Sequence, residues 1–422
     1  MSNILIATDA RFIRLPDGSV HAEDPSSNYQ FFNRYLKAFT LVTVLARIKD
    51  VSWLPSGTVR ASGENVRFHP LPYYLGPWQF LRKFSGILRR MTVAVQSSDA
   101  ICIRVPGVIG FGLWLTVRSK RRPIAIEVVG DPWAALAPGT VPSVVRPLAR
   151  LLFTYAQRKL CAEAIAVSYV SSTLQRIYPP SPVAFVTRYS SVELAPMVIV
   201  GSRALARRLA QIDTKAQNRA SVWKLIFVGS LALLYKAPDI FLEAIQLCIN
   251  SGLNLTATIV GGGKYQIDIE NMAQRIGLRN QVSFTGQLPM GDCIYQKLDE
   301  ADLFVMPSRT EGLPRAMIEA MARGCPCIGT SVGGIPELLA SEDMVAPNNS
   351  QALAIKITEV LSDSERMKRM ATRNVEVAQS YRSDILSNRR QTFYEETRRQ
   401  AEVYWQKHGR NIKPEFFRPN EF

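Results

Sequence analysis

Two carboxylates with seven residues between them, Glu311 and Glu319, could bind the hydroxyl groups or cations of a ligand. The apolar run 302–305 before them indicates a buried strand, and the residues after Pro314 predict a helix over 315–323. Proline is favourable at this first turn because its missing N–H costs no hydrogen bond there. A loop from a strand end into a helix N-terminus commonly binds anions in α/β proteins. This stretch is therefore the candidate active site.

A second loop carries a cation toward the same edge of the predicted sheet. Gly229 follows an apolar run and allows a ligand to approach the backbone closely, with Ser230 directly after it. Lys236 lies where the next helix is expected to begin, so its ammonium can reach a phosphate. A lone lysine is usually just an exposed cation, but its place between strand and helix favours binding.

Two further glycine-rich turns follow predicted strands. The turn at 259–264, which contains Gly262, has neither the P-loop spacing nor a G-x-G-x-x-G pattern, and tight passage of the chain explains it adequately. The turn at 330–337 contains Gly333 and Gly334 and opens a helix. One helix is expected to begin after the Glu311 loop and another after the turn at 330–337. Together with Lys236, these two helix N-termini predict a site for a diphosphate.

Asp131 is the candidate in the N-terminal half. It follows the predicted strand 124–129, and the adjacent Gly130 and Pro132 place it in a loop at the strand's carboxyl end. This position faces ligands in open α/β sheets, so Asp131 could orient a sugar hydroxyl or a nucleophile. An aspartate that caps a turn or a helix fits the same pattern, and the sequence leaves both interpretations open.

Alternating strands and helices predict an α/β protein with two Rossmann-like, doubly wound domains around a central cleft. We expect an N-terminal domain over 1–200, an interdomain linker over 201–223, a C-terminal domain over 224–380, and a helical tail over 381–422 that packs on the N-terminal domain. The expected strands are 4–7, 41–46, 66–71, 100–105, 124–129 and 164–167, then 225–228, 255–260, 282–284, 303–306 and 326–329. Helices are expected at 29–39, 78–95, 146–162 and 171–178, and residues 12–28 read as irregular.

The net charge of +16 over 422 residues suggests an anionic partner, although surface cations can simply aid solubility. The predicted helix 78–95 is basic and amphipathic, which fits either a membrane surface or, with more weight, a crossover helix packed on the sheet. No run is long enough to span a membrane, and no secretory signal is evident, so we expect a cytoplasmic protein, peripheral at most at the inner membrane face.

Several other chemistries are disfavoured. Three histidines and six scattered cysteines supply no zinc site, so no metal is expected, and the cysteines read as buried thiols. No G-x-S-x-G elbow indicates a hydrolase. No nucleic-acid-binding module or basic–aromatic array is present, so nucleic acid is not expected as a partner.

The chain resembles the retaining glycosyltransferases of the GT-B fold, family 4, also described as group 1. The resemblance covers most of the C-terminal domain and is far less diagnostic in the N-terminal half. It rests on the Gly229 to Lys236 loop, the Ile-Val-Gly-Gly-Gly turn at 259–263, Val-Ser-Phe-Thr-Gly at 282–286, the Glu311/Glu319 pair and Gly-Gly-Ile-Pro-Glu at 333–337.

The resemblance implies a nucleotide diphosphate sugar as donor substrate and no separate cofactor. Glu311 would hold hydroxyls of the donor sugar, and the N–H groups of Gly312 and Leu313 would lie near sugar and phosphate. Glu319 would hold the ribose, and Lys236 would neutralise the diphosphate as the glycosidic bond breaks. Donor contacts are also expected from the remaining glycine turns, at Gly229, Ser230, Gly262, Gly333 and Gly334.

Two departures from the family pattern affect this expectation. Ser230 stands where members often have an arginine, so one phosphate cation is absent or comes from elsewhere. Gly130 and Asp131 stand where many members have a histidine, and Asp131 could take over part of its role. The leading hypothesis is sugar transfer to a lipid-linked or saccharide acceptor in cell-surface polysaccharide synthesis. A nucleotide-sugar epimerase and a non-catalytic nucleotide-sugar-binding or membrane-scaffolding subunit are the alternatives.

Overall fold

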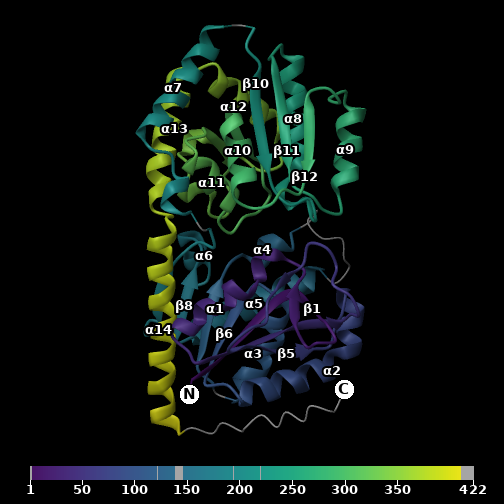
Figure 1. Cartoon of the computed structure of the whole chain (residues 1–422), viewed down its shortest axis with the longest axis vertical. Coiled ribbons are helices and arrows are strands. Elements are labelled where there is room, and N and C mark those ends of the chain that lie inside the picture. Colours follow the sequence, from purple (N-terminus) through teal and green to yellow (C-terminus); the bar gives the residue numbers. More distant parts are fainter. Residues whose placement is uncertain (1, 121, 138–145, 193, 219, 410–422) are drawn as a thin grey trace.

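The computed structural model describes residues 2–120, 122–137, 146–192, 194–218 and 220–409. It contains two α/β domains, one above the other in Figure 1, each with a largely parallel sheet between layers of helices. Parallel strands that are buried on both faces require long apolar runs. Most of these strands could therefore be predicted from the sequence.

The N-terminal sheet has nine strands. Seven of them follow the order β4-β2-β1-β6-β7-β8-β9, while β3 pairs with β1 and β5 pairs with β3. Among the described strands, the pairs β1–β2 and β2–β4 are antiparallel and the others are parallel. Their bounds are β1 Asn3–Arg14, β2 Val20–Ala22, β3 Leu41–Asp50, β4 Val59–Arg60, β5 Val66–Leu71, β6 Ala100–Val105, β7 Ile124–Val128, β8 Ala166–Tyr169 and β9 Phe185–Arg188.

The prediction that residues 12–28 are irregular is partly wrong. Strand β1 continues to Arg14 and turns back into β2, with a register shift against β3 between Ala7 and Arg11. The shift interrupts the apolar alternation, so the sequence pattern stops at Ala7 although the strand does not. The helix expected at 29–39 is also divided, into α1 Tyr29–Asn33 and a 3-10 helix Arg34–Lys37.

One face of this sheet is covered by α2 Gly76–Gln96, α3 Val108–Lys120 and α5 Arg146–Glu163, which share a core with the strands. Helix α2 buries Ile87 and Met91 in that core and leaves Trp78 exposed. It is therefore the crossover helix that the amphipathic pattern favoured. The N-terminal domain also contains two short helices on the side that faces the C-terminal domain (Figure 1), α4 Pro132–Ala135 and α6 Ser172–Ile177.

The C-terminal sheet has six parallel strands in the order β12-β11-β10-β13-β14-β15. The strands are β10 Trp223–Val228, β11 Leu255–Val260, β12 Val282–Gly286, β13 Leu303–Met306, β14 Cys327–Thr330 and β15 Met344–Val345. The helices are α7 Ser202–Gln217, α8 Pro238–Asn250, α9 Gln266–Arg275, α10 Asp292–Glu300, α11 Arg315–Ala322, α12 Ser350–Leu361 and α13 Ser364–Gln379. Five further 3-10 helices are Pro25–Ser27, Pro196–Val198, Leu234–Lys236, Ile335–Glu337 and Ser341–Asp343.

The segment 201–223, expected as an interdomain linker, is mostly helix. Helix α7 packs on α13, and the Arg208 guanidinium donates to the backbone carbonyls of Leu298 and Ala301 at the end of α10. Carbonyls at a helix C-terminus lack intrahelical partners and attract a cation, so α7 is bound to the C-terminal domain on two sides.

Helix α14 Ser383–His408 leaves α13 and runs along the N-terminal domain (Figure 1). Tyr394 stacks on Tyr35 with 4.1 Å between ring centroids, and Trp405 Nε1 donates to the carbonyl of Asp99 at 2.7 Å. These contacts explain the aromatic residues of the tail. Residues 410–422 of the expected tail lie outside the described residues.

Within the described residues no helix has the length and apolar character needed to cross a bilayer. All six cysteines are free, and all but Cys293 are buried.

Candidate functional site

Lys236 and Glu311, 75 positions apart, form an ion pair between two loops at the carboxyl end of the C-terminal sheet. Lys236 Nζ lies 2.6 Å from Glu311 Oε1, and both side chains are largely buried. Ser308 Oγ donates to the same carboxylate oxygen at 2.7 Å. Burial lowers the pKa of Lys236, but the charge and hydrogen bond of Glu311, together with Tyr235, outweigh burial and hold the pKa above its ordinary value. Lys236 is therefore positively charged near neutral pH.

Arg309 fixes the geometry of these loops. Its guanidinium forms a bidentate pair with Asp239 at 2.9 and 2.5 Å and also donates to the carbonyl of Leu234 at 2.6 Å. Its backbone N–H donates to the carbonyl of Tyr235, next to Lys236. Sequence reasoning missed Ser308, Arg309 and Asp239, because residue types alone do not indicate which distant loops meet.

The glycines predicted near the ligand let the loops approach one another. Gly333 has φ of +54°, and a Cβ there would lie 1.8 Å from the carbonyl oxygen of Glu311. A Cβ on Gly334 would lie 2.5 Å from the oxygen of Gly312, and one on Gly261 would lie 1.9 Å from the oxygen of Gly229. Side chains at these positions would separate the turns. The predicted residues Gly229, Ser230, Gly262, Gly312, Leu313, Gly333 and Gly334 thus lie on loops that meet around the Lys236–Glu311 pair.

Glu319 and Arg315 lie on α11, which starts directly after the Glu311 loop. Burial raises the pKa of the Glu319 carboxyl, opposed by the positive charge of Arg315. Arg315 is exposed, and its charge also acts on Lys236. The site therefore has a second cation, on the first turn of α11, at a position that the sequence analysis did not single out.

The C-terminal loops contact the N-terminal domain directly. A Cβ on Gly312 would lie 2.3 Å from the carbonyl oxygen of Val129, next to Asp131. Glu337 accepts hydrogen bonds from the backbone N–H groups of Ser172 and Thr173, both at 2.9 Å, at the start of α6. A carboxylate is stabilised by the unpaired N–H groups at a helix N-terminus, so Glu337 joins the two domains in this arrangement.

We expect Glu337→Ala to loosen this domain contact. Charge-assisted hydrogen bonds are worth about 1.5–3 kcal/mol each, so the variant, which loses two of them, should lose about 3–6 kcal/mol of unfolding free energy. Small-angle scattering should detect a larger radius of gyration, and urea unfolding measures the stability. Glu342→Ala, at an exposed position nearby, is the matched control. Equal stability and size for both variants would rule out the contact.

Asp131 lies at the carboxyl end of β7 as predicted, and its visible contacts are structural. Its Oδ1 accepts from the backbone N–H of Trp133 at 2.9 Å, which caps α4, and from the hydroxyl of Tyr178. The helix-cap interpretation left open by the sequence is therefore observed. A role toward a substrate stays a prediction.

Asp9 is a second acid at this edge. It lies at the register shift inside β1, where the apolar pattern of the strand is interrupted, and the sequence analysis did not identify it. Its carboxylate lies 3.3 to 3.4 Å from the backbone N of Ile109 at the start of α3, and Arg47 Nη2 is 3.8 Å away. Burial raises the pKa of Asp9 to about 6, against the opposing effects of Arg47 and the N–H groups.

This raised pKa predicts a pH effect on stability. The folded state binds the proton more tightly than the unfolded state, so the contribution of Asp9 is fully present below the unfolded pKa of 3.8 and lost as the pH rises through about 6. The resulting loss of unfolding free energy between low and high pH is at most about 3 kcal/mol. Solvent screening reduces it, because the Asp9 side chain keeps some exposure. Asp9→Asn should therefore reduce the fall in unfolding free energy between about pH 4 and about pH 8. Urea unfolding at both pH values checks this, and an unchanged fall would contradict it.

Residues 210–376 match the model of the family described as Glycosyl transferases group 1. Protein CapJ of Staphylococcus aureus is 26% identical over 353 residues, which span 82% of this chain and 83% of CapJ. The amylovoran biosynthesis glycosyltransferase AmsK of Erwinia amylovora is 33% identical over 128 residues, which span only 28% of this chain and 31% of AmsK.

A structure of HepE from Anabaena in complex with UDP and glucose superimposes with a TM-score of 0.61 at 16% identity. The superposition covers 92% of this chain and 98% of that one, so the likeness extends over both domains. The predicted GT-B architecture is confirmed. The chain thus has the GT-B fold, and its residues 210–376 match a group 1 glycosyl transferase domain.

Proposed function

We propose that this protein is a retaining, metal-independent glycosyltransferase that uses a nucleotide diphosphate sugar. The observation that carries the proposal is the buried Lys236–Glu311 pair between two loops at the carboxyl edge of the sheet. A cation suited to phosphate and a carboxylate suited to sugar hydroxyls lie in direct contact there. This arrangement fits a donor whose sugar and phosphate are joined by a single bond.

The contacts of the pair suggest how the donor is held. Both hydrogen bonds that described residues donate to the Glu311 carboxylate use Oε1, which would leave Oε2 for a hydroxyl of the donor sugar. Lys236 would neutralise the diphosphate, helped by Arg315 from the first turn of α11. Arg315 would thereby supply the positive charge near the phosphate that an arginine often provides in the family at the position of Ser230. Glu319, on the same helix, would bind the ribose.

In the proposed reaction, the bond between the anomeric carbon and the phosphate oxygen breaks, and the bonding electrons leave with the diphosphate. The acceptor oxygen bonds to the anomeric carbon on the same face, so the configuration is retained. The acceptor's proton passes to the departing phosphate oxygen. Lys236 and Arg315 would lower the barrier because preorganised cations stabilise the charge that develops on the leaving group.

The acceptor would bind to the N-terminal domain, as a saccharide or a lipid-linked saccharide. AmsK acts in amylovoran biosynthesis by its description, which supports a role in cell-surface polysaccharide synthesis. Such an enzyme would work in the cytoplasm, at the inner face of the membrane.

Thermal-shift measurements with UDP-, GDP- and ADP-sugars test the donor assignment. HepE contains UDP and glucose in its solved complex, so UDP-glucose is the first donor to try. A bound donor stabilises the protein by RT ln(1 + [L]/Kd), and mass spectrometry of the products identifies the reaction. Product formation only with an acceptor supports transfer. Rapid isomerisation of the donor alone would indicate an epimerase, and binding with no chemistry would indicate a non-catalytic subunit.

Asp131→Asn tests the proposed role of Asp131 at the acceptor. Asparagine keeps an Oδ1 acceptor for the Trp133 N–H, so the melting temperature should change little. If the charge orients an acceptor hydroxyl, the transfer rate should fall by about tenfold to a hundredfold. A rate close to that of the native protein would leave Asp131 as a helix cap alone.

A further inference from the structure

Helix α5 has an apolar stripe on the side that faces away from the core. Leucines at 148, 151 and 152 and Tyr155 expose between 42% and 61% of their surface. Their i, i+3, i+4, i+7 spacing places them on one side of the helix. The opposite side of α5 buries Ala156, Gln157, Leu160 and Cys161. The helix therefore carries more apolar surface than its packing on the sheet uses. We call these four residues the α5 stripe.

The layer that contains the α5 stripe is strongly basic. Of the helices α2, α3 and α5 in this layer, α2 and α5 contain eight lysines and arginines and one acid, Glu163 at the end of α5. All three helices bury their inner sides in the same core, so their outer sides face away from the same face of the sheet. Exposed apolar residues are found on α2 as well, at Trp78 and Leu81. This combination of charge and apolar area is complementary to an anionic amphiphilic surface.

The α5 stripe adjoins the proposed acceptor edge. Arg150 of α5 stacks its guanidinium over the ring of Trp133 at 3.7 Å, and its Nε donates to the Trp133 carbonyl at 2.6 Å. Trp133 is 44% exposed and lies two positions after Asp131. An exposed tryptophan with an arginine beside it is suited to a lipid headgroup region, because both have an apolar body and a polar end.

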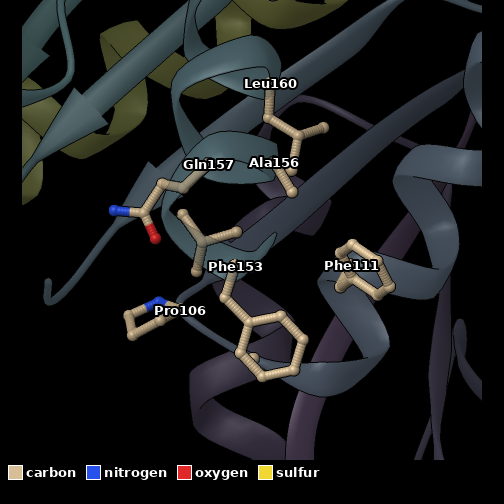
Figure 2. A pocket seen from close by; sticks show the side chains of 8 residues that line it. Pro106, Phe111, Phe153, Ala156, Gln157 and Leu160 are labelled. Atoms are coloured by element: carbon tan, nitrogen blue, oxygen red, sulfur yellow. The ribbon is translucent and has the colours of Figure 1, made fainter. Parts of the chain in front are cut away.

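The space beneath the α5 stripe is too small for a lipid chain. Figure 2 shows the cavity between α3 and α5, lined by Pro106, Phe111, Phe153, Gln157 and neighbours. Its volume is about 10 Å³, which holds no more than one water molecule. Lipid would therefore meet the outside of α5 rather than enter between the helices.

We propose that the α5 stripe and Trp133 dock on an anionic lipid bilayer, with α5 lying in the membrane interface and the Asp131 edge beside the headgroups. The delivery of a lipid-linked acceptor to that edge rests on the proposed function; the docking itself does not. A nucleic acid would use the cations alone, because phosphate contacts dominate its binding. The exposed leucines of the stripe favour lipid.

Sedimentation with vesicles tests the docking on the full chain without any nucleotide sugar. We expect binding to phosphatidylcholine vesicles that contain phosphatidylglycerol, and at least about tenfold weaker binding to phosphatidylcholine alone. Leu148→Ser/Leu151→Ser should weaken binding about tenfold or more, since two apolar side chains no longer enter the interface. Arg158→Glu/Lys159→Glu should have a similar effect that shrinks at high salt.

Matched controls lie on the C-terminal domain. Ile267→Ser/Ile355→Ser removes two equally exposed apolar side chains, and Arg203→Glu/Arg207→Glu reverses two exposed charges of α7. These variants should bind vesicles as the native protein does. Melting curves verify that each variant is folded, which is expected because every changed side chain is exposed.

No preference for phosphatidylglycerol, or equal binding by the α5 and control variants, would overturn the docking. So would binding to double-stranded DNA that equals vesicle binding at the same salt concentration. Because the vesicle experiment needs no donor, it can fail while sugar transfer is retained, and it can succeed if the transferase assignment fails.

Discussion

Lys236→Ala should lower the rate of sugar transfer by about 10²- to 10³-fold, the usual cost of removing one preorganised group that stabilises developing charge. The side chain lies against Glu311 in a buried site, whereas Arg315 is on the exposed first turn of α11 and is not expected to replace it fully. Michaelis constants should change less than turnover, because the charge on the leaving diphosphate is greatest in the transition state. Initial rates with the donor identified by thermal shift measure both constants.

The same substitution should destabilise the fold, because it leaves the Glu311 carboxylate buried without its counter-charge. Breaking a buried pair in this way costs about 3–5 kcal/mol. Lys236→Ala/Glu311→Ala should therefore be less destabilised than the sum of its single variants, and its activity should not fall much below that of either one.

The exposed pair Lys297–Glu300, at 2.9 Å, provides the control for this cycle. Lys297→Ala should cost under about 1 kcal/mol, as expected of an exposed ion pair, and leave transfer unchanged. Additive stabilities in the Lys236/Glu311 cycle, or a Lys236→Ala enzyme with more than half of the native rate, would refute the proposed role of the pair.

Gly312→Ala should have a comparable effect on activity through the contact between domains. The added methyl would lie 2.3 Å from the carbonyl oxygen of Val129, which is backbone and cannot move aside as a side chain does. The Glu311 loop and the Asp131 edge must then separate, and a misplacement of about 1 Å can reduce a rate by about a hundredfold. Overpacking also costs about 1–3 kcal/mol of stability.

Activity assays and urea unfolding of Gly312→Ala measure these two losses. Gly86→Ala is the control, because a Cβ there meets nothing within 4 Å and the residue is inside α2. Alanine is the better helix former, so this control should gain up to about 1 kcal/mol with unchanged activity. A Gly312→Ala protein with native activity would indicate that the contact with Val129 is not needed for transfer.

Five of the six strands of the C-terminal domain could be predicted from the sequence, whereas β15 and helix α7 were not predicted. The predicted strands at 255–260 and 303–306 coincide with β11 and β13, because central parallel strands need continuous apolar residues that are visible locally. The loops with Glu311, Lys236 and Gly333 were located for a related reason: the carboxyl ends of parallel strands lie along one edge of the sheet. The GT-B architecture followed from the order of these elements and from the resemblance of their motifs.

Which side chains meet depends on how distant loops pack together. The Lys236–Glu311 contact, the clamp of Arg309 on Asp239, and the capping of α6 by Glu337 join residues 70 to 165 positions apart. A hydrogen bond forms over about 3 Å, and no spacing along the chain reports a distance of that size. The sequence therefore predicts helices and strands, because their signals are local. The packing of the two domains determines which partner each charged side chain has. It also determines which apolar side of α5 stays exposed.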